Sequence, residues 1–144
     1  MRQAIILSAG QGSRLGQLTH DRPKCLIEFA GRTLLDRQLD TLAAVGIERA
    51  TVVTGFRDDQ IEAALERRRQ AGEGPEVRTI FNPFYKVADN LGSCWIVRGE
   101  MDRDFIILNG DTLVSPDIVA TLIAQSTAPI TVTIDVKDEY DLDD

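Results

Sequence analysis

Short apolar runs alternate with segments of helical periodicity throughout this sequence. The apolar runs have the length and composition of β-strands and occupy residues 4–8, 50–54, 77–81, 104–109 and 130–136. The helical segments occupy residues 33–45, 57–70, 91–98 and 116–125. Strands that alternate with helices form right-handed βαβ units. The sequence therefore predicts an α/β protein built on a doubly wound, parallel sheet of five strands, with the charged run 66–69 facing solvent.

The composition limits what this protein binds. Its 144 residues fit one domain, residues 1–144, and its net charge of −7 argues against a nucleic-acid partner, which requires a basic face. We expect no membrane partner, because no apolar stretch approaches the ~18 residues of a membrane span. Cys25 and Cys94 are far apart and lack metal-ligand spacing, which predicts two reduced thiols in a cytoplasmic protein.

The first predicted strand leads directly into a glycine-rich loop, residues 7–16, with the sequence LSAGQGSRLG. Glycines let backbone N–H groups approach a ligand, and successive N–H groups form an anion-binding concavity. Two cations stand at fixed spacing, Arg14 within this loop and Lys24 after it. A phosphate ligand, and specifically a triphosphate, suits such a loop.

Two common phosphate-binding loops do not fit this pattern. A P-loop requires Gly-Lys-Ser/Thr, whereas Ser13-Arg14 follows Gly12 here. A dinucleotide-binding fingerprint requires a third glycine where Leu15 stands, and an acidic residue at the end of the second strand, which ends in Thr54. Nicotinamide and flavin cofactors are therefore disfavoured.

Three loops follow the carboxyl ends of predicted strands: the glycine-rich loop, residues 54–56, and residues 109–112. Ligands of doubly wound sheets bind at this edge, so we expect the loops to share one site. Asp111 follows a strand and a glycine there, in a position suited to Mg²⁺ or to capping the turn.

The third kind of loop is found in a known family. Residues 7–15 (LSAGQGSRL), 22–26 (RPKCL) and 31–35 (GRTLL) resemble the nucleotidyltransferase family that includes sugar-1-phosphate nucleotidylyltransferases. This sequence departs from the family pattern at Ser8, where alanine is usual, and at Thr33, where proline is usual. The resemblance implies a Rossmann-like, mostly parallel sheet with helices on both faces, the nucleotide-diphospho-sugar transferase-like fold.

The segment 82–95, NPFYKVADNLGSCW, resembles the phosphocholine cytidylyltransferase branch. This implies transfer of a nucleotidyl group from CTP to a small phosphorylated acceptor such as phosphocholine, with release of pyrophosphate. A sugar-1-phosphate nucleotidylyltransferase that uses UTP, GTP or dTTP remains the alternative. A regulatory module that binds nucleotide without turnover is a further alternative.

The resemblance also implies roles for individual residues. Catalysis would depend on Arg14 at the β- and γ-phosphates, on Lys24 at the α-phosphate or the acceptor phosphate, and on Asp111 as the Mg²⁺ ligand. Arg22 is as readily a solvent-exposed cation as a phosphate ligand, and His20 is expected to be solvated. The expected nucleotide-binding residues are Leu7, Ser8, Ala9, Gly10, Gly12, Ser13, Arg14, Lys24, Tyr85, Asn90 and Ser93.

Two expectations concern the acceptor. Tyr85, Trp95 and Asp89 could together bind a quaternary ammonium through cation–π and charge contacts, or Trp95 could instead pack in the core. Family members are longer, so we expect this chain to lack the acceptor-binding part and a second metal-binding aspartate, for which Asp135 is a weak substitute.

Overall fold

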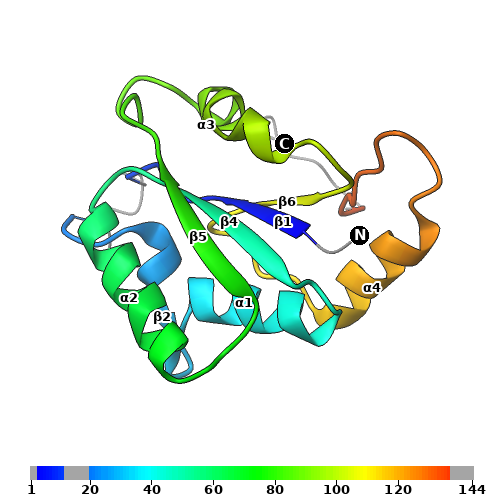
Figure 1. Cartoon of the computed structure of the whole chain (residues 1–144), viewed down its shortest axis with the longest axis horizontal. Coiled ribbons are helices and arrows are strands. Elements are labelled where there is room, and N and C mark those ends of the chain that lie inside the picture. The colour runs from blue at the N-terminus through cyan, green and yellow to red at the C-terminus, as the bar shows by residue number, and fades with distance from the viewer. Residues whose placement is uncertain (1–2, 12–19, 137–144) are drawn as a thin grey trace.

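The computed structural model describes residues 3–11 and 20–136. Four parallel strands form its central sheet in the order β5-β4-β1-β6 (Figure 1). They are β1 (Gln3–Leu7), β4 (Arg49–Thr54), β5 (Glu76–Phe81) and β6 (Ile106–Asn109). Each lies within a predicted strand or extends it by one residue at its start, which confirms the doubly wound α/β fold.

A small antiparallel hairpin precedes the first helix and was not expected from the sequence. It pairs β2 (Glu28–Phe29) with β3 (Arg32–Thr33), after a single 3₁₀ turn, η2 (Lys24–Leu26). Ala30 and Gly31 connect the strands, and both have positive φ, 48° and 78°. Such two-residue turns match the twist of a hairpin. Strands of two residues are too short to leave a recognisable pattern in the sequence.

The helices agree closely with the predicted segments. They are α1 (Leu34–Ala44), α2 (Asp58–Gln70), α3 (Asn90–Val97) and α4 (Pro116–Gln125), with a 3₁₀ turn, η3 (Arg98–Glu100), after α3. Side chains cap three of them: the oxygens of Thr33, Asp89 and Ser115 accept hydrogen bonds from backbone N–H groups of the first turns of α1, α3 and α4. Capping residues of this kind mark the starts of these three helices in the sequence, and the starts of all four helices agree with the prediction to within one residue.

The helices cover both faces of the sheet. Figure 1 shows α1, α2 and α4 on one face and α3 on the other. Successive strand residues point to opposite faces. Accordingly, Ile6 and Val52 pack with α1, α2 and α4, whereas Ile5 and Val53 pack beneath α3. Within the described residues, no helix is long and apolar enough to cross a membrane.

The fifth predicted strand, residues 130–136, is absent. This segment has no regular secondary structure, and its four apolar side chains are 71–83% exposed. The alternation of apolar residues with threonine and aspartate favours a strand, but a strand forms only where a neighbouring strand accepts its hydrogen bonds. In the described part of the chain this segment pairs with no strand, so the predicted five-stranded sheet is wrong.

Candidate functional site

A cavity of about 440 Å³ opens at the carboxyl ends of β1 and β6. The residues that line it belong to the end of β1, the η2 turn, the start of α3 and the turn after β6: Leu7, Ser8, Gly10, Lys24, Cys25, Asp89, Asn90, Leu91, Asn109, Gly110 and Asp111. Six of these were predicted as site residues from the sequence: Leu7, Ser8, Gly10, Lys24, Asn90 and Asp111. Three other predicted site residues, Gly12, Ser13 and Arg14, lie outside the described residues.

The start of the glycine-rich loop is held by backbone hydrogen bonds to β4 and the residues after it. The Ser8 N–H donates to the Val53 carbonyl, and the Phe56 N–H donates to the Ala9 carbonyl, each at 2.9 Å. Ala9 is buried and does not line the cavity. Residues 54–56 therefore hold the loop in place but do not line the cavity. The glycine-rich loop and residues 109–111 line it, as expected.

Lys24 and Asp111 meet within this cavity. The Lys24 Nζ lies 3.1 Å from the Asp111 Oδ2, and both side chains are partly exposed. The η2 turn brings the lysine to the cavity, and the turn after β6 brings the carboxylate. The site thus places this ion pair at the edge where doubly wound sheets bind ligands, with Asp89 as a second carboxylate in the lining.

Close packing fixes the turn that carries Asp111. The Gly110 N–H donates to the Leu7 carbonyl at 2.8 Å. A Cβ at position 110 would overlap with the Ser8 Oγ and would lie 2.8 Å from the Leu7 oxygen. Only glycine fits at this position without displacing the end of β1.

The start of α3 forms the opposite wall. Asp89 caps the helix, and the Asn90 Nδ2 donates to the Asn109 Oδ1 at 3.0 Å, which joins α3 to the end of β6. Of the other predicted residues of this segment, Ser93 is buried and accepts a hydrogen bond from the Asn82 Nδ2 at 3.1 Å. Tyr85 packs against the core beneath α3. Neither lines the cavity.

The side chains present suit Mg²⁺ held jointly by protein and substrate. In the described residues, no three His, Cys, Asp or Glu side chains gather into a metal-binding cluster. Mg²⁺ commonly uses one or two carboxylates and takes its other ligands from substrate phosphates and water. Asp111 has the required chemistry, and the cavity has room for phosphates beside it.

Comparison with known proteins places the chain in a family. The model of the MobA-like NTP transferase domain matches residues 4–140. The chain belongs to this family. The family assignment confirms the resemblance found in residues 7–35.

Named relatives of this NTP transferase domain include enzymes for different nucleotides. CTP:phosphoglutamine cytidylyltransferase of Campylobacter jejuni is 41% identical over 124 residues, which make up 83% of this chain and 47% of the relative. N-acetylmuramate alpha-1-phosphate uridylyltransferase of Caulobacter vibrioides is 43% identical over 74 residues, 51% of this chain and 31% of the relative.

A solved structure shares the fold. CTP:phosphocholine cytidylyltransferase of Streptococcus pneumoniae has a TM-score of 0.68 at 28% identity, over 81% of this chain and 50% of that one. The chain thus spans half or less of the length of each of these three relatives.

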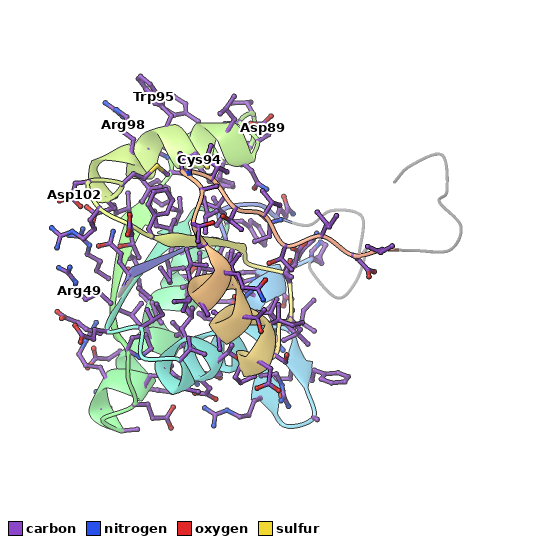
Figure 2. The ribbon with its side chains drawn as sticks, turned by 90° about the vertical axis from the view of Figure 1, so that its right-hand side faces the viewer. Arg49, Asp89, Cys94, Trp95, Arg98 and Asp102 are labelled. Atoms are coloured by element: carbon purple, nitrogen blue, oxygen red, sulfur yellow. The ribbon has the colours of Figure 1, made fainter. Side chains whose placement is uncertain are left out.

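In this NTP transferase domain, Trp95 lies apart from the two residues with which it was expected to bind a quaternary ammonium, Tyr85 and Asp89. Figure 2 shows Trp95 and Arg98 on the outer side of α3 and Asp89 at the other end of the helix. Trp95 is 66% exposed, and the Arg98 guanidinium lies 4.2 Å from the centre of its ring. The expectation that Trp95 packs in the core is therefore wrong, and Trp95 and Tyr85 do not form a joint site with Asp89.

The two cysteines are free thiols. Cys25 is buried in the wall of the cavity, and this burial raises the pKa of its thiol to about 12. The thiolate is the reactive form of cysteine. Cys25 therefore stays protonated and serves as an apolar packing group beside Lys24.

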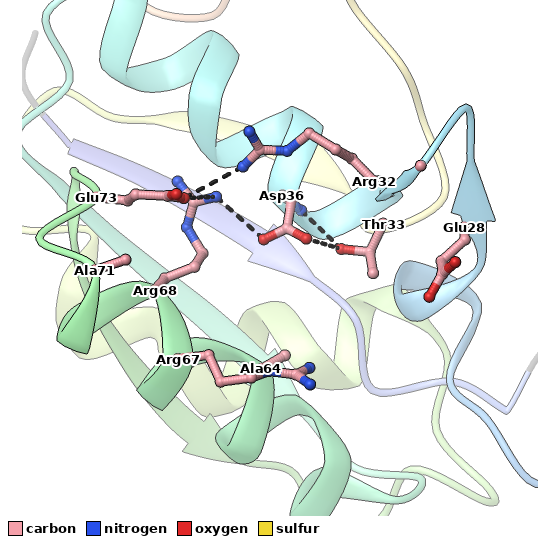
Figure 3. A pocket seen from close by; sticks show the side chains of 10 residues that line it. Glu28, Arg32, Thr33, Asp36, Ala64, Arg67, Arg68, Ala71 and Glu73 are labelled. Atoms are coloured by element: carbon pink, nitrogen blue, oxygen red, sulfur yellow. Dashed lines mark hydrogen bonds and ion pairs between the residues drawn. The ribbon is translucent and has the colours of Figure 1, made fainter.

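A second cavity, of about 300 Å³, lies between the hairpin, α1 and α2 (Figure 3). Arg68 was expected to face solvent, but it is only 6% exposed. Its guanidinium lies 3.1 Å from the Asp36 carboxylate and 2.9 Å from those of Asp40 and Glu73. These acids neutralise the buried charge, so the network ties α1 to the end of α2.

Proposed function

We propose that this NTP transferase domain transfers a nucleotidyl group from CTP to a small phosphorylated acceptor such as phosphocholine and releases pyrophosphate. The observation that carries the proposal is the ion pair between Lys24 and Asp111, which lies in the cavity at the carboxyl ends of β1 and β6. A cavity of about 440 Å³ is within the range of small-molecule sites.

In this reaction an acceptor phosphate oxygen forms a bond to the α-phosphorus. The bond from the α-phosphorus to the bridging oxygen breaks, and that oxygen keeps the electron pair as pyrophosphate leaves. The acceptor phosphate is already ionised at neutral pH, so no general base is needed, in keeping with an exposed His20. The protein's contribution is alignment and charge neutralisation.

We assign the charged residues to these tasks. Lys24 would exchange its contact with Asp111 for the α-phosphate or the acceptor phosphate. Arg14 would bind the β- and γ-phosphates, for which a planar guanidinium is suited. Asp111 would hold Mg²⁺, which when bound neutralises phosphate charge. Leu7, Ser8 and Gly10 would contact the nucleotide.

Cytidine and a phosphocholine-like acceptor are supported by residues 82–95 and by the two relatives named as cytidylyltransferases. The 43% identical uridylyltransferase supports the second candidate, transfer to a sugar 1-phosphate. The free thiols of Cys25 and Cys94 support a cytoplasmic setting for either reaction.

Pyrophosphate release distinguishes the candidates. The 144-residue chain would be incubated with Mg²⁺, each of CTP, UTP, GTP and dTTP, and either phosphocholine or glucose 1-phosphate. Release with CTP and phosphocholine alone supports the proposal, whereas release with a sugar 1-phosphate supports the second candidate. Binding of CTP, seen as a thermal shift, without release with any pair would instead identify a nucleotide-binding module.

A further inference from the structure

Gln38 connects α1 to the turn that carries Asp111. Its side chain is buried, with 1% of the residue exposed. The Nε2 donates to the Asn109 carbonyl and to the Thr112 carbonyl, both at 2.7 Å. These two carbonyls belong to the first and last residues of the turn, which the Thr112 N–H closes onto the Asn109 carbonyl at 3.2 Å. Asp111 therefore lies inside the segment that one amide group holds at both ends.

The chemistry of this contact restricts the residue at position 38. Two carbonyl oxygens face the same nitrogen, so the side chain must offer two N–H donors at one atom. A primary amide does this without charge, whereas a carboxylate would repel both carbonyls.

The same side chain also carries a structural cost. The Oε1 of Gln38 is buried and has no hydrogen-bond partner among the described residues. Leaving a buried acceptor unpaired is unfavourable, because the atom loses its hydrogen bonds to water. An apolar side chain of similar size would avoid this cost, so burial alone does not explain the amide. What the Gln38 amide adds, and an apolar side chain would not, is a pair of hydrogen bonds that hold the 109–112 turn.

Thr41 provides a comparison on the same helix. Its Oγ1 donates to the Val114 carbonyl at 3.3 Å, and the residue is largely buried. This contact also joins α1 to the chain after β6, but it falls beyond the turn 109–112. It can stabilise the packing of α1 without fixing Asp111.

We infer that Gln38 is a positioning residue, which holds the 109–112 turn so that the Asp111 carboxylate stays at a fixed place beside Lys24. The inference rests on the proposed function only in its consequence, which is that the Mg²⁺ requirement of the reaction depends on Gln38. The fixed turn itself is a property of the protein without ligand.

The test compares Gln38→Met with Thr41→Val, which each remove side-chain hydrogen bonds from α1 and keep the volume similar. In the metal-free protein, NMR measures the exchange of the backbone amide of Thr112. We expect about tenfold faster exchange in Gln38→Met, because the turn opens more easily once the two hydrogen bonds from Nε2 are lost. We expect no change in Thr41→Val. The Mg²⁺ concentration for half-maximal pyrophosphate release should rise about tenfold or more in Gln38→Met alone.

Equal effects of the two variants on exchange, or on the Mg²⁺ requirement of active enzyme, would overturn the inference. If Gln38→Met does not fold, the wild-type protein still decides: through-hydrogen-bond couplings from Nε2 to the carbonyl carbons of Asn109 and Thr112 support the inference, and their absence contradicts it. If the wild-type chain releases no pyrophosphate, the proposed function fails, and the exchange measurement still decides the role of Gln38.

Discussion

The Lys24 Nζ lies 3.1 Å from the Asp111 Oδ2, although the two residues are 87 positions apart in the chain. Their side chains are 29% and 47% exposed. Ion pairs this accessible contribute about 0–1 kcal/mol to stability, so the pair can open at little cost. In the proposed reaction the lysine would turn to a phosphate and the carboxylate to Mg²⁺. In that reaction the substrate and Mg²⁺ would replace the contact between the two side chains.

Lys24→Met should lower the rate of pyrophosphate release by about 10²–10³-fold, because it removes a charge that stabilises the transition state. The melting temperature should change little, since the ion pair is exposed. Lys86→Met is the matched control, because Lys86 lies over the Tyr85 ring and does not line the cavity. Equal rates in the wild type and Lys24→Met would remove Lys24 from the proposed site.

Asp111→Asn should weaken the response to Mg²⁺, because an amide oxygen is a poorer ligand for this hard cation than a carboxylate. The measurement is the rate as a function of Mg²⁺ concentration. Asp117→Asn, on the exposed first turn of α4, controls for the loss of one negative charge. A normal Mg²⁺ response in Asp111→Asn would contradict the assigned role.

Gly110→Ala should lower the free energy of unfolding by about 1–3 kcal/mol, the usual cost of forcing an extra methyl group into close packing. The new Cβ would press against the Ser8 Oγ and the Leu7 carbonyl. Urea denaturation gives the value. Gly99→Ala is the control, because a Cβ there meets no atom within 4 Å. Equal stability of the two variants would show that the turn has more room than the structure indicates.

Asp36 should make stability dependent on pH in the acid range. Burial by itself would raise its pKa, but hydrogen bonds from Thr33 and Arg68 and the charge of Arg68 outweigh burial and hold the pKa below its ordinary value of 3.8. A group with a lowered pKa in the folded state stabilises the protein above its unfolded pKa and loses this effect as the pH falls through the folded pKa.

Asp36→Asn should therefore be less stable than the wild type at pH 7, by about 1 kcal/mol for charge-assisted hydrogen bonds of this kind. The difference should shrink as the pH falls below 3.8. Urea denaturation at a series of pH values measures it, with Asp104→Asn, at an exposed position, as the control. A difference that stays constant down to pH 2 would exclude Asp36 as the cause.

The sequence was sufficient to predict the four strands of the sheet, the four helices and the edge where the cavity lies. Strand length, helical period and capping residues are local signals, and the topology of a parallel sheet then brings the strand ends together. Lys24 and Asp111 could be predicted for the same reason, because each stands in a motif at that edge.

Other features depended on contacts between distant segments. Arg68 reads as one of several surface arginines, and its burial follows only from the positions of Asp36, Asp40 and Glu73. Gln38 reads as a helix residue, and only the packing of α1 under β6 shows what it binds. The alternation in residues 130–136 indicates a strand, but no local pattern shows whether a partner strand is present.

The most direct measurement is ³¹P NMR of the 144-residue chain with CTP, Mg²⁺ and phosphocholine, repeated with Lys24→Met. The wild type should convert CTP and phosphocholine into pyrophosphate and a new diphosphate diester, and the variant should do so at least about 10²-fold more slowly. Unchanged resonances with the wild-type chain, or equal conversion by both proteins, would contradict a nucleotidyl-transfer site built on Lys24 and Asp111.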